Sequence, residues 1–177
     1  MRKILFISLA LWPLFCLSQD KGEELVFWTA GQRLTWTDYK GKADPSTGAA
    51  ASTATFLGID YTFSPKGLTY TITCSFSKTR SWGLHKNEYI LQHEQGHFDI
   101  AEIFARKLNM KMATYKFNKS TYKTDLQKIY DDVVNEKEET QNAYDKETDH
   151  SIKKDKQAEW LNRIEKMLKE YEGYASY

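Results

Sequence analysis

Cysteine is scarce in this chain, which has only two, Cys16 and Cys74, among 177 residues. Cys16 lies in an N-terminal stretch with the pattern of an export signal, so Cys74 would remain alone after export. One cysteine cannot form an internal disulfide, and the stability of the mature chain must then come from packing. Because Cys74 alternates with apolar residues in a strand-like run, we interpret it as a small buried hydrophobic residue.

The chain also lacks an apolar run long enough to span a bilayer comfortably. Arg2 and Lys3 precede an apolar stretch over residues 4–15, and Ser18 offers a small residue for cleavage. This pattern predicts a secretory signal peptide over residues 1–18. Polar sequence follows at once, so no stable membrane anchor is expected. We therefore expect residues 19–177 to form a single periplasmic or secreted domain, large enough to bury a core.

Neither sign of charge is in excess, because 25 lysines and arginines oppose 24 acidic residues and give a formal net charge of +1. Nucleic acid is therefore not expected as a partner. The short basic run at Lys153, Lys154 and Lys156 lies beside Asp155 and Glu159, as in a solvated helix face.

Histidine is rare as well, with four in the chain, yet two of them stand in the pattern His93-Glu94-Gln95-Gly96-His97. In a helix, two histidines four residues apart point the same way and can bind one metal ion. Apolar residues recur with a helical period from about residue 87 to 115, without proline. Zinc suits two imidazoles, and Glu94 would act as the general base on a metal-bound water.

A catalytic zinc normally has three protein ligands and one open position. His150 is the preferred third ligand, because it stands in a predicted break between two helices, where a side chain can be aimed at another element. Three nearby carboxylates, Asp145, Glu147 and Asp149, remain open as alternatives. Glu102 lies about 160° around the helix from the two motif histidines and is not expected to bind the metal.

The two halves of the chain differ in their apolar periodicity. Strand-like segments come first, at residues 25–29, 33–37, 51–64 and 68–78, and the last two read as a hairpin around residues 64–67. The motif helix follows, then a second helix over residues 122–144 and a third from about 152 to 171. We therefore predict an α+β fold in which a small N-terminal antiparallel β-sheet with a hairpin packs on a C-terminal three-helix region.

Three stretches resemble a known bacterial family. They are residues 34–41 (LTWTDYKG), 90–102 (ILQHEQGHFDIAE) and 144–150 (YDKETDH), the last followed by Gln157 and Trp160. Together they resemble the proteins grouped as domain of unknown function 922, which are described as secreted zinc-dependent proteases. The resemblance implies a zincin-like fold and adds weight to His150 as a motif position. The chain departs from the family pattern after this histidine, where it has Ser151 instead of glycine.

The function expected from these observations is a zinc-dependent metalloprotease acting on a peptide or protein substrate, with Zn²⁺ on His93, His97 and His150 and with Glu94 as catalytic base. Two alternatives remain open. One is a non-catalytic zinc-binding periplasmic interaction or scaffold module, against which the intact Glu94 argues. The other is a metal-dependent hydrolase of a non-peptide amide.

Four further side chains have two readings each. Tyr144 is either a hydrogen-bond donor for the reaction or a core residue. Arg106 either anchors a carboxylate such as Asp99 or Asp145 or is exposed. Trp36 and Trp82 either line a cleft or pack in the core. The strand predicted over residues 68–78 could hold an extended peptide by edge pairing.

Overall fold

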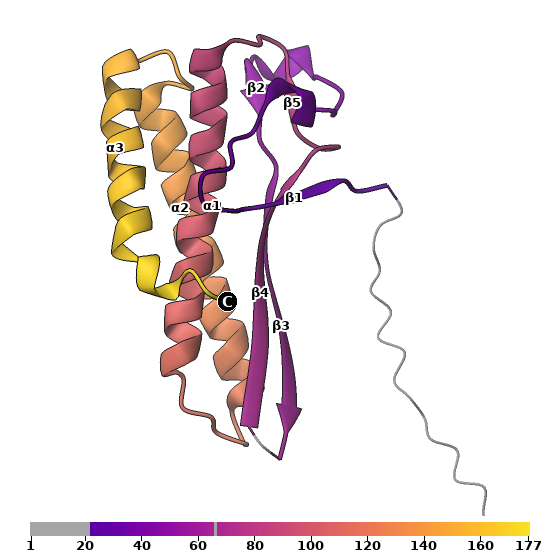
Figure 1. Cartoon of the computed structure of the whole chain (residues 1–177), viewed down its shortest axis with the longest axis vertical. Helices are drawn as coiled ribbons and strands as arrows, with labels where there is room; N and C mark the ends of the chain where they lie inside the picture. Colours follow the sequence, from indigo (N-terminus) through magenta and orange to yellow (C-terminus); the bar gives the residue numbers. More distant parts are fainter. Residues whose placement is uncertain (1–21, 66) are drawn as a thin grey trace, which may run out of the picture.

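The computed structural model describes residues 22–65 and 67–177 and shows a long β-hairpin lying along a layer of three helices (Figure 1). The export signal predicted over residues 1–18 lies outside the described residues. The strands are β1 (Leu25–Phe27), β2 (Ala51–Ser52), β3 (Thr55–Ser64), β4 (Gly67–Ser77) and β5 (Trp82–Gly83). The helices are α1 (Glu88–Thr114), α2 (Tyr122–Thr148) and α3 (Lys154–Glu170). The predicted α+β class, with a small antiparallel sheet and three helices, is confirmed.

The strands form two antiparallel sheets. The larger has the order β1-β4-β3, and the smaller pairs β2 with β5. The hairpin predicted around residues 64–67 is confirmed, since β3 and β4 pair from Thr55↔Phe76 to Ser64↔Gly67. Gly67 has φ +119°, a backbone conformation that glycine adopts without strain and that lets the chain reverse there.

Two of the predicted strands are wrong. Residues 33–37 form no strand, because Asp38 Oδ2 accepts hydrogen bonds from the backbone N–H and the hydroxyl of Thr35 and closes a 3₁₀ turn at residues 36–38. Residues 51–64 do not form one strand but two, β2 and β3, which belong to different sheets. At the break, the backbone N–H of Ala54 donates to the hydroxyl of Ser81 instead of to a strand.

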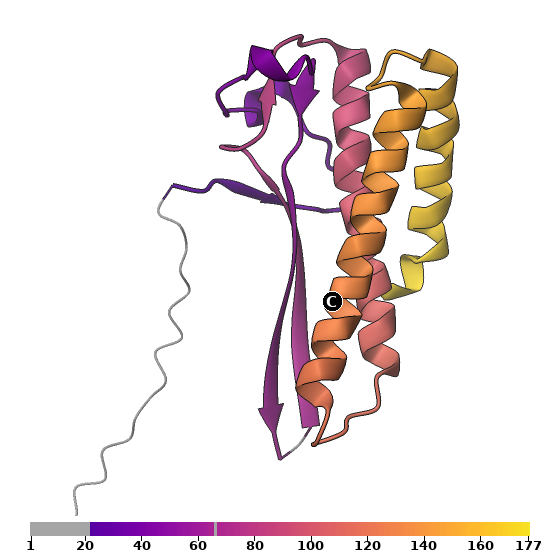
Figure 2. The same ribbon diagram turned by 180° about the vertical axis from the view of Figure 1, so that it is seen from behind.

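Helix α1 is the centre of the molecule. It packs against α2, α3, β3 and β4, and it separates α3 from the long hairpin (Figures 1 and 2). Its apolar positions follow the predicted helical period and are almost completely buried; they are Leu91, Phe98, Ile100, Ala101, Ile103, Phe104, Ala105, Leu108 and Met112. Burying a side chain of this size stabilises the fold by about 1.5–3 kcal/mol. No helix within residues 22–65 and 67–177 is both long and apolar enough to cross a membrane.

Cys74 is buried in β4, with 3% of its surface exposed, and it is a free thiol. Burial raises the pKa of the Cys74 thiol well above its usual range. The sulfur is therefore protonated and belongs to the core, as the sequence predicted.

Candidate metal centre

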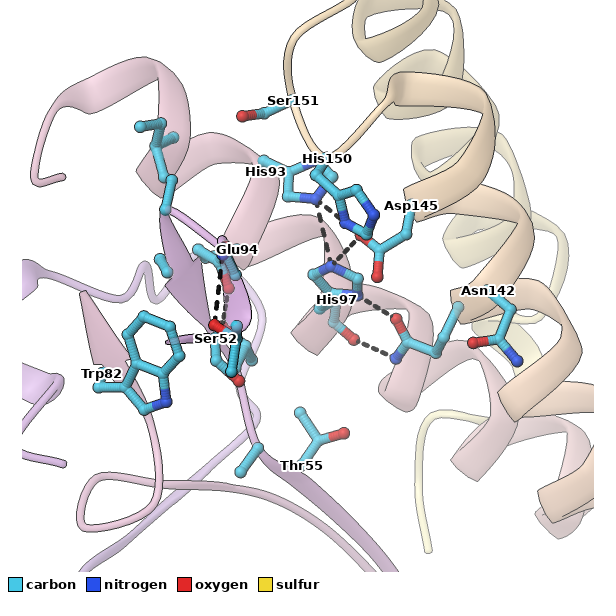
Figure 3. Close-up of a pocket in the computed structure, with 18 of the residues that line it drawn as sticks. Ser52, Thr55, Trp82, His93, Glu94, His97, Asn142, Asp145, His150 and Ser151 are labelled. Atoms are coloured by element: carbon cyan, nitrogen blue, oxygen red, sulfur yellow. Dashed lines mark hydrogen bonds and ion pairs between the residues drawn. The ribbon is translucent and has the colours of Figure 1, made fainter. Parts of the chain in front are cut away.

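The two motif histidines lie on one face of α1, close to its N-terminus. Asn87 caps the helix, since its side-chain oxygen accepts the backbone N–H of Ile90 at 2.9 Å. His93 and His97 are one helical turn apart, and their Nε2 atoms are 3.3 Å from each other (Figure 3). The sequence prediction of two ring nitrogens placed to share one ion is confirmed in its geometry.

A third ligand atom comes from α2. The Oδ1 atom of Asp145 lies 3.1 Å from His93 Nε2 and 3.1 Å from His97 Nε2 (Figure 3). Among the described residues, these three side chains form a group whose ligand atoms lie close enough together to hold a metal ion. From the sequence, Asp145 was one of three carboxylate alternatives to His150 as the third ligand.

The spacing of the three atoms fits zinc. With metal–ligand bonds of 2.0–2.1 Å, two ligands of a tetrahedral zinc ion stand about 3.3 Å apart. The distances among His93 Nε2, His97 Nε2 and Asp145 Oδ1 are 3.1–3.3 Å. Two imidazoles and one carboxylate also form a donor set that catalytic zinc uses, with a fourth position left for water or substrate.

The protonation of the three groups is coupled. Burial would raise the pKa of Asp145, but hydrogen bonds with His93 and His97 outweigh it and hold that pKa well below its usual range. Burial lowers the pKa of His93. Burial also acts to lower the pKa of His97, but the hydrogen bond to Asp145 and the nearby charge of Glu94 raise it overall. The carboxylate is thus ionised and His93 is neutral at pH 7, as metal ligands must be.

His150 lies beside this group but is largely exposed. Its Nδ1 atom is 3.6 Å from Asp145 Oδ1, and 68% of its side chain is accessible. Asp149, His150 and Ser151 all have positive φ angles, of 52°, 51° and 74°, which non-glycine residues adopt at a cost. Glu147, another carboxylate alternative for the third ligand, accepts a hydrogen bond from Trp160 of α3 instead.

Gln141, which the sequence reasoning missed, fixes the ring of His97. Its Nε2 donates to the backbone oxygen of His97 at 2.9 Å, and its Oε1 accepts a hydrogen bond from His97 Nδ1. The amide orientation therefore makes Nδ1 the protonated nitrogen and leaves Nε2 with a lone pair for a metal. Gln141 precedes Asp145 by one helical turn, and this spacing is the feature of the sequence that could have identified it. His93 Nδ1, in contrast, is buried without a hydrogen-bond partner among the described residues.

Glu94 is buried beside the histidines and is held by a second missed residue. The hydroxyl of Thr53 donates to Glu94 Oε2 at 2.6 Å, and it also shares a hydrogen bond of 2.9 Å with the hydroxyl of Tyr39. Thr53 sits at the break between β2 and β3, where the chain leaves one sheet for the other. The break in the predicted strand thus positions the side chain that orients Glu94.

Tyr144 belongs to the core. It is completely buried, stacks on the His93 ring with centroids 4.4 Å apart, and donates its hydroxyl to the backbone oxygen of His93 at 3.2 Å. A Cβ atom at Gly96 would lie 2.5 Å from this hydroxyl, so only glycine fits between the two histidines at that position. The tyrosine supports the helix that carries the site, and its hydroxyl is already used.

The three ligand candidates and Glu94 line a cleft of about 480 Å³ (Figure 3). One wall is formed by residues 49–55, which include β2, and β2 has an unpaired edge because β5 is its one partner within the described residues. Residues 68–78, which we expected to hold a peptide by edge pairing, do not line the cleft, and β1 pairs with the Ser75–Ser77 end of β4. Trp82 lines the cleft, whereas Trp36 packs on Tyr39.

The opposite side of α1 carries a different set of buried polar groups. Arg106 donates to Glu102 at 2.8 Å and to the backbone oxygen of Leu168 at 2.6 Å. Glu102 also accepts the hydroxyl of Tyr177. Arg106 therefore does anchor a carboxylate, but this is Glu102, and neither Asp99 nor a residue of the metal group.

The sequence matches a family of bacterial proteins of unknown function (DUF922) over residues 19–151. The chain belongs to this family. The match includes every residue of the candidate metal group, Glu94 and His150. No curated protein and no solved structure matches the chain.

Proposed function

We propose that this DUF922 protein is an exported, zincin-like metallohydrolase that cleaves peptide bonds. One observation carries the proposal: His93, His97 and Asp145 aim three ligand atoms at one another in the cleft that Glu94 also lines. Two ring nitrogens and a carboxylate oxygen converge at 3.1–3.3 Å, where a shared proton or a cation must lie between them, and two imidazoles with one carboxylate are a donor set that zinc uses.

The residues would divide the work as follows. His93, His97 and Asp145 would hold zinc, which when bound supplies a Lewis acid that polarises a carbonyl and acidifies water. Glu94 takes a proton from the attacking water and passes it to the leaving amine. Thr53 occupies Oε2 of Glu94, and Oε1 accepts no hydrogen bond from the described residues, so Oε1 is the atom that would carry the proton.

The cleft wall supports a peptide as the substrate. An extended peptide can pair with an exposed strand edge through its backbone, without dependence on its side chains. The unpaired edge of β2 lies in the cleft with Glu94, so a peptide bound there would run past the carboxylate. A small non-peptide amide would have no use for this edge.

Replacing Glu94 by glutamine tests the enzyme reading. The amide has nearly the shape of the acid and Glu94 is not a proposed ligand, so Glu94→Gln should keep one zinc per chain. Cleavage of a peptide library should fall by about 10²–10⁴-fold, because the positioned base is lost. Equal cleavage by the two proteins would refute the mechanism, and zinc binding without cleavage by the wild type would favour the scaffold alternative.

Calorimetric zinc titration of Asp145→Asn and His150→Ala decides the third ligand. We expect Asp145→Asn to bind zinc far more weakly than the wild type, and His150→Ala to bind it nearly as well, because His150 is exposed and lies outside the converging group. His93→Ala, which removes a ligand in either case, is the control. The reverse order of the two variants would make His150 the third ligand.

A further inference from the structure

Aromatic side chains gather at the end of the molecule farthest from the cleft. The end of the β3–β4 hairpin and the connection between α1 and α2 lie side by side there, whereas β2 and β5 lie at the other end (Figures 1 and 2). We call the four aromatic residues Tyr61, Phe63, Phe117 and Tyr122 the aromatic tip. The rings of Phe63 and Phe117 have centroids 4.0 Å apart, and those of Phe63 and Tyr122 are 4.9 Å apart.

The aromatic tip is open to solvent although three of its rings pack together. Tyr61 is 44% exposed, Phe63 39% and Phe117 42%. Three large apolar residues exposed together at one end are not needed to close the core, which is centred on α1. A contiguous exposed apolar patch on a protein surface indicates an interaction site.

Lysines outnumber carboxylates around the aromatic tip. Lys116, Lys119 and Lys123 are exposed and form no ion pair with the described part of the chain, and residues 61–70 and 115–124 contain neither aspartate nor glutamate. The nearest carboxylates along the chain are Asp60, which is exposed next to Tyr61, and Asp125, which accepts hydrogen bonds from Tyr115 and from a threonine hydroxyl. The surface around the rings is therefore positive, in a chain whose net charge is close to zero.

We propose that the aromatic tip docks reversibly on the surface of an anionic lipid bilayer. Aromatic rings favour the boundary between headgroups and acyl chains, and lysines beside them are attracted to anionic headgroups. The hairpin end and the α1–α2 connection together form one narrow end of the molecule, which can approach a planar surface (Figure 1). The cleft at the opposite end would stay open to water, so docking is compatible with access to the candidate metal centre.

Sedimentation of the full-length mature protein with lipid vesicles tests this inference. We expect association with vesicles of phosphatidylglycerol and phosphatidylcholine but not with phosphatidylcholine alone, and most of it should be lost in 0.5 M salt, where charges are screened beyond about 4 Å. Each lysine near an anionic surface contributes about a fivefold factor in partitioning. Replacing Lys116, Lys119 and Lys123 together by glutamine should therefore weaken binding on the order of 100-fold.

The rings need their own variant and matched controls. Phe117→Ser should weaken vesicle binding about tenfold, whereas Phe117→Tyr, which keeps an interfacial ring, should retain it. Ile152→Ser removes the most exposed large apolar residue, which lies away from the aromatic tip, and should leave binding unchanged. Replacing Lys153, Lys166 and Lys169, all exposed on or beside α3, by glutamine removes the same charge and should also have little effect.

Three results would overturn the proposal. The first is no association with anionic vesicles by a protein whose circular dichroism shows it folded. The second is equal weakening by the lysine set of α3 and the set at the aromatic tip, which would reduce the effect to net charge. The third is self-association in lipid-free solution that Phe117→Ser abolishes, which would assign the aromatic tip to a second copy of the chain. None of these measurements depends on zinc or on cleavage.

Discussion

Helix α1 buries polar and charged groups on two sides, and the two sides treat them differently. On the side towards α3 and the C-terminal residues, Glu102 is 2% exposed and Arg106 is 5% exposed, and each meets the other and further partners within the chain. On the cleft side, His93 is 3% exposed, and its Nε2 faces two other acceptor atoms. We call these the paired side and the metal side of α1.

The comparison separates structure from function among buried charges. A buried charge that is fully paired within the chain holds the fold together, and removing one partner leaves the other uncompensated. Converging acceptors do the opposite: they repel unless a proton or a cation lies between them, so their cost is recovered only when a ligand binds. The difference lies in the direction of the lone pairs, since His93 is as deeply buried as Glu102 and Arg106.

The largest effect is expected on the paired side. Glu102→Ala leaves the buried guanidinium of Arg106 and the hydroxyl of Tyr177 without their acceptor, and it should lower the free energy of unfolding by about 3–5 kcal/mol. Urea denaturation measures this loss. The control is Asp132→Ala, which breaks an exposed pair with Lys128 at the same helical spacing and should cost less than 1 kcal/mol.

Zinc binding by Glu102→Ala tests whether the two sides of α1 are independent. The protein that remains folded in Glu102→Ala should still bind one zinc ion, because Glu102 lies away from the metal group. A small loss of stability would mean that Arg106 finds another acceptor. Loss of zinc from the folded fraction would mean that the two sides of α1 are not independent.

The next effect belongs to the metal side. Gln141→Ala removes both hydrogen bonds that fix the ring of His97, and the loss of such a partner typically weakens metal binding by about 10–100-fold. Zinc affinity, measured by competition with a chelator, reports this change. Gln127→Ala, on an exposed part of the same helix, is the control, since the side chain of Gln127 donates a hydrogen bond to Asp131 and is not part of the metal group. Unchanged affinity in Gln141→Ala would show that the packing of Tyr144 alone orients the imidazole.

Local patterns in the sequence predicted more of the fold than of the site. The motif helix was expected from about residue 87 to 115 and runs over Glu88–Thr114, because apolar periodicity is recorded in the helix's own residues. The strand predicted over residues 51–64 was broken by contacts with residues far along the chain, notably the bond from Thr53 to Glu94. A pattern within one segment carries no information about such contacts.

The third ligand shows the same limit more sharply. The second helix was predicted over residues 122–144, but α2 continues to Thr148, so Asp145 is helical and its direction is set by the helix. One turn earlier, Gln141 points the same way and reaches His97. Had the second helix been predicted to end one turn later, Asp145 would have been the favoured third ligand. The end of a helix, however, is the feature that sequence periodicity locates least well.

The smallest expected effect concerns the backbone strain beside the metal side. Ser151 has φ +74°, the last of three consecutive positive angles beside the cleft, and the family pattern that the chain resembles has glycine there. Ser151→Gly should relieve the strain and raise the free energy of unfolding by about 0.5–1 kcal/mol, after the extra entropy of glycine in the unfolded chain is deducted. Ser120→Gly is the control: its φ is not positive, so glycine should lower stability there. Thermal denaturation of the two metal-free variants compares them directly. If Ser151→Gly is also destabilising, the contacts of the serine outweigh its backbone strain. If it stabilises as expected, the metal side keeps a strained turn next to His150 where the paired side of α1 keeps none, and the difference between the two sides extends from charge to backbone.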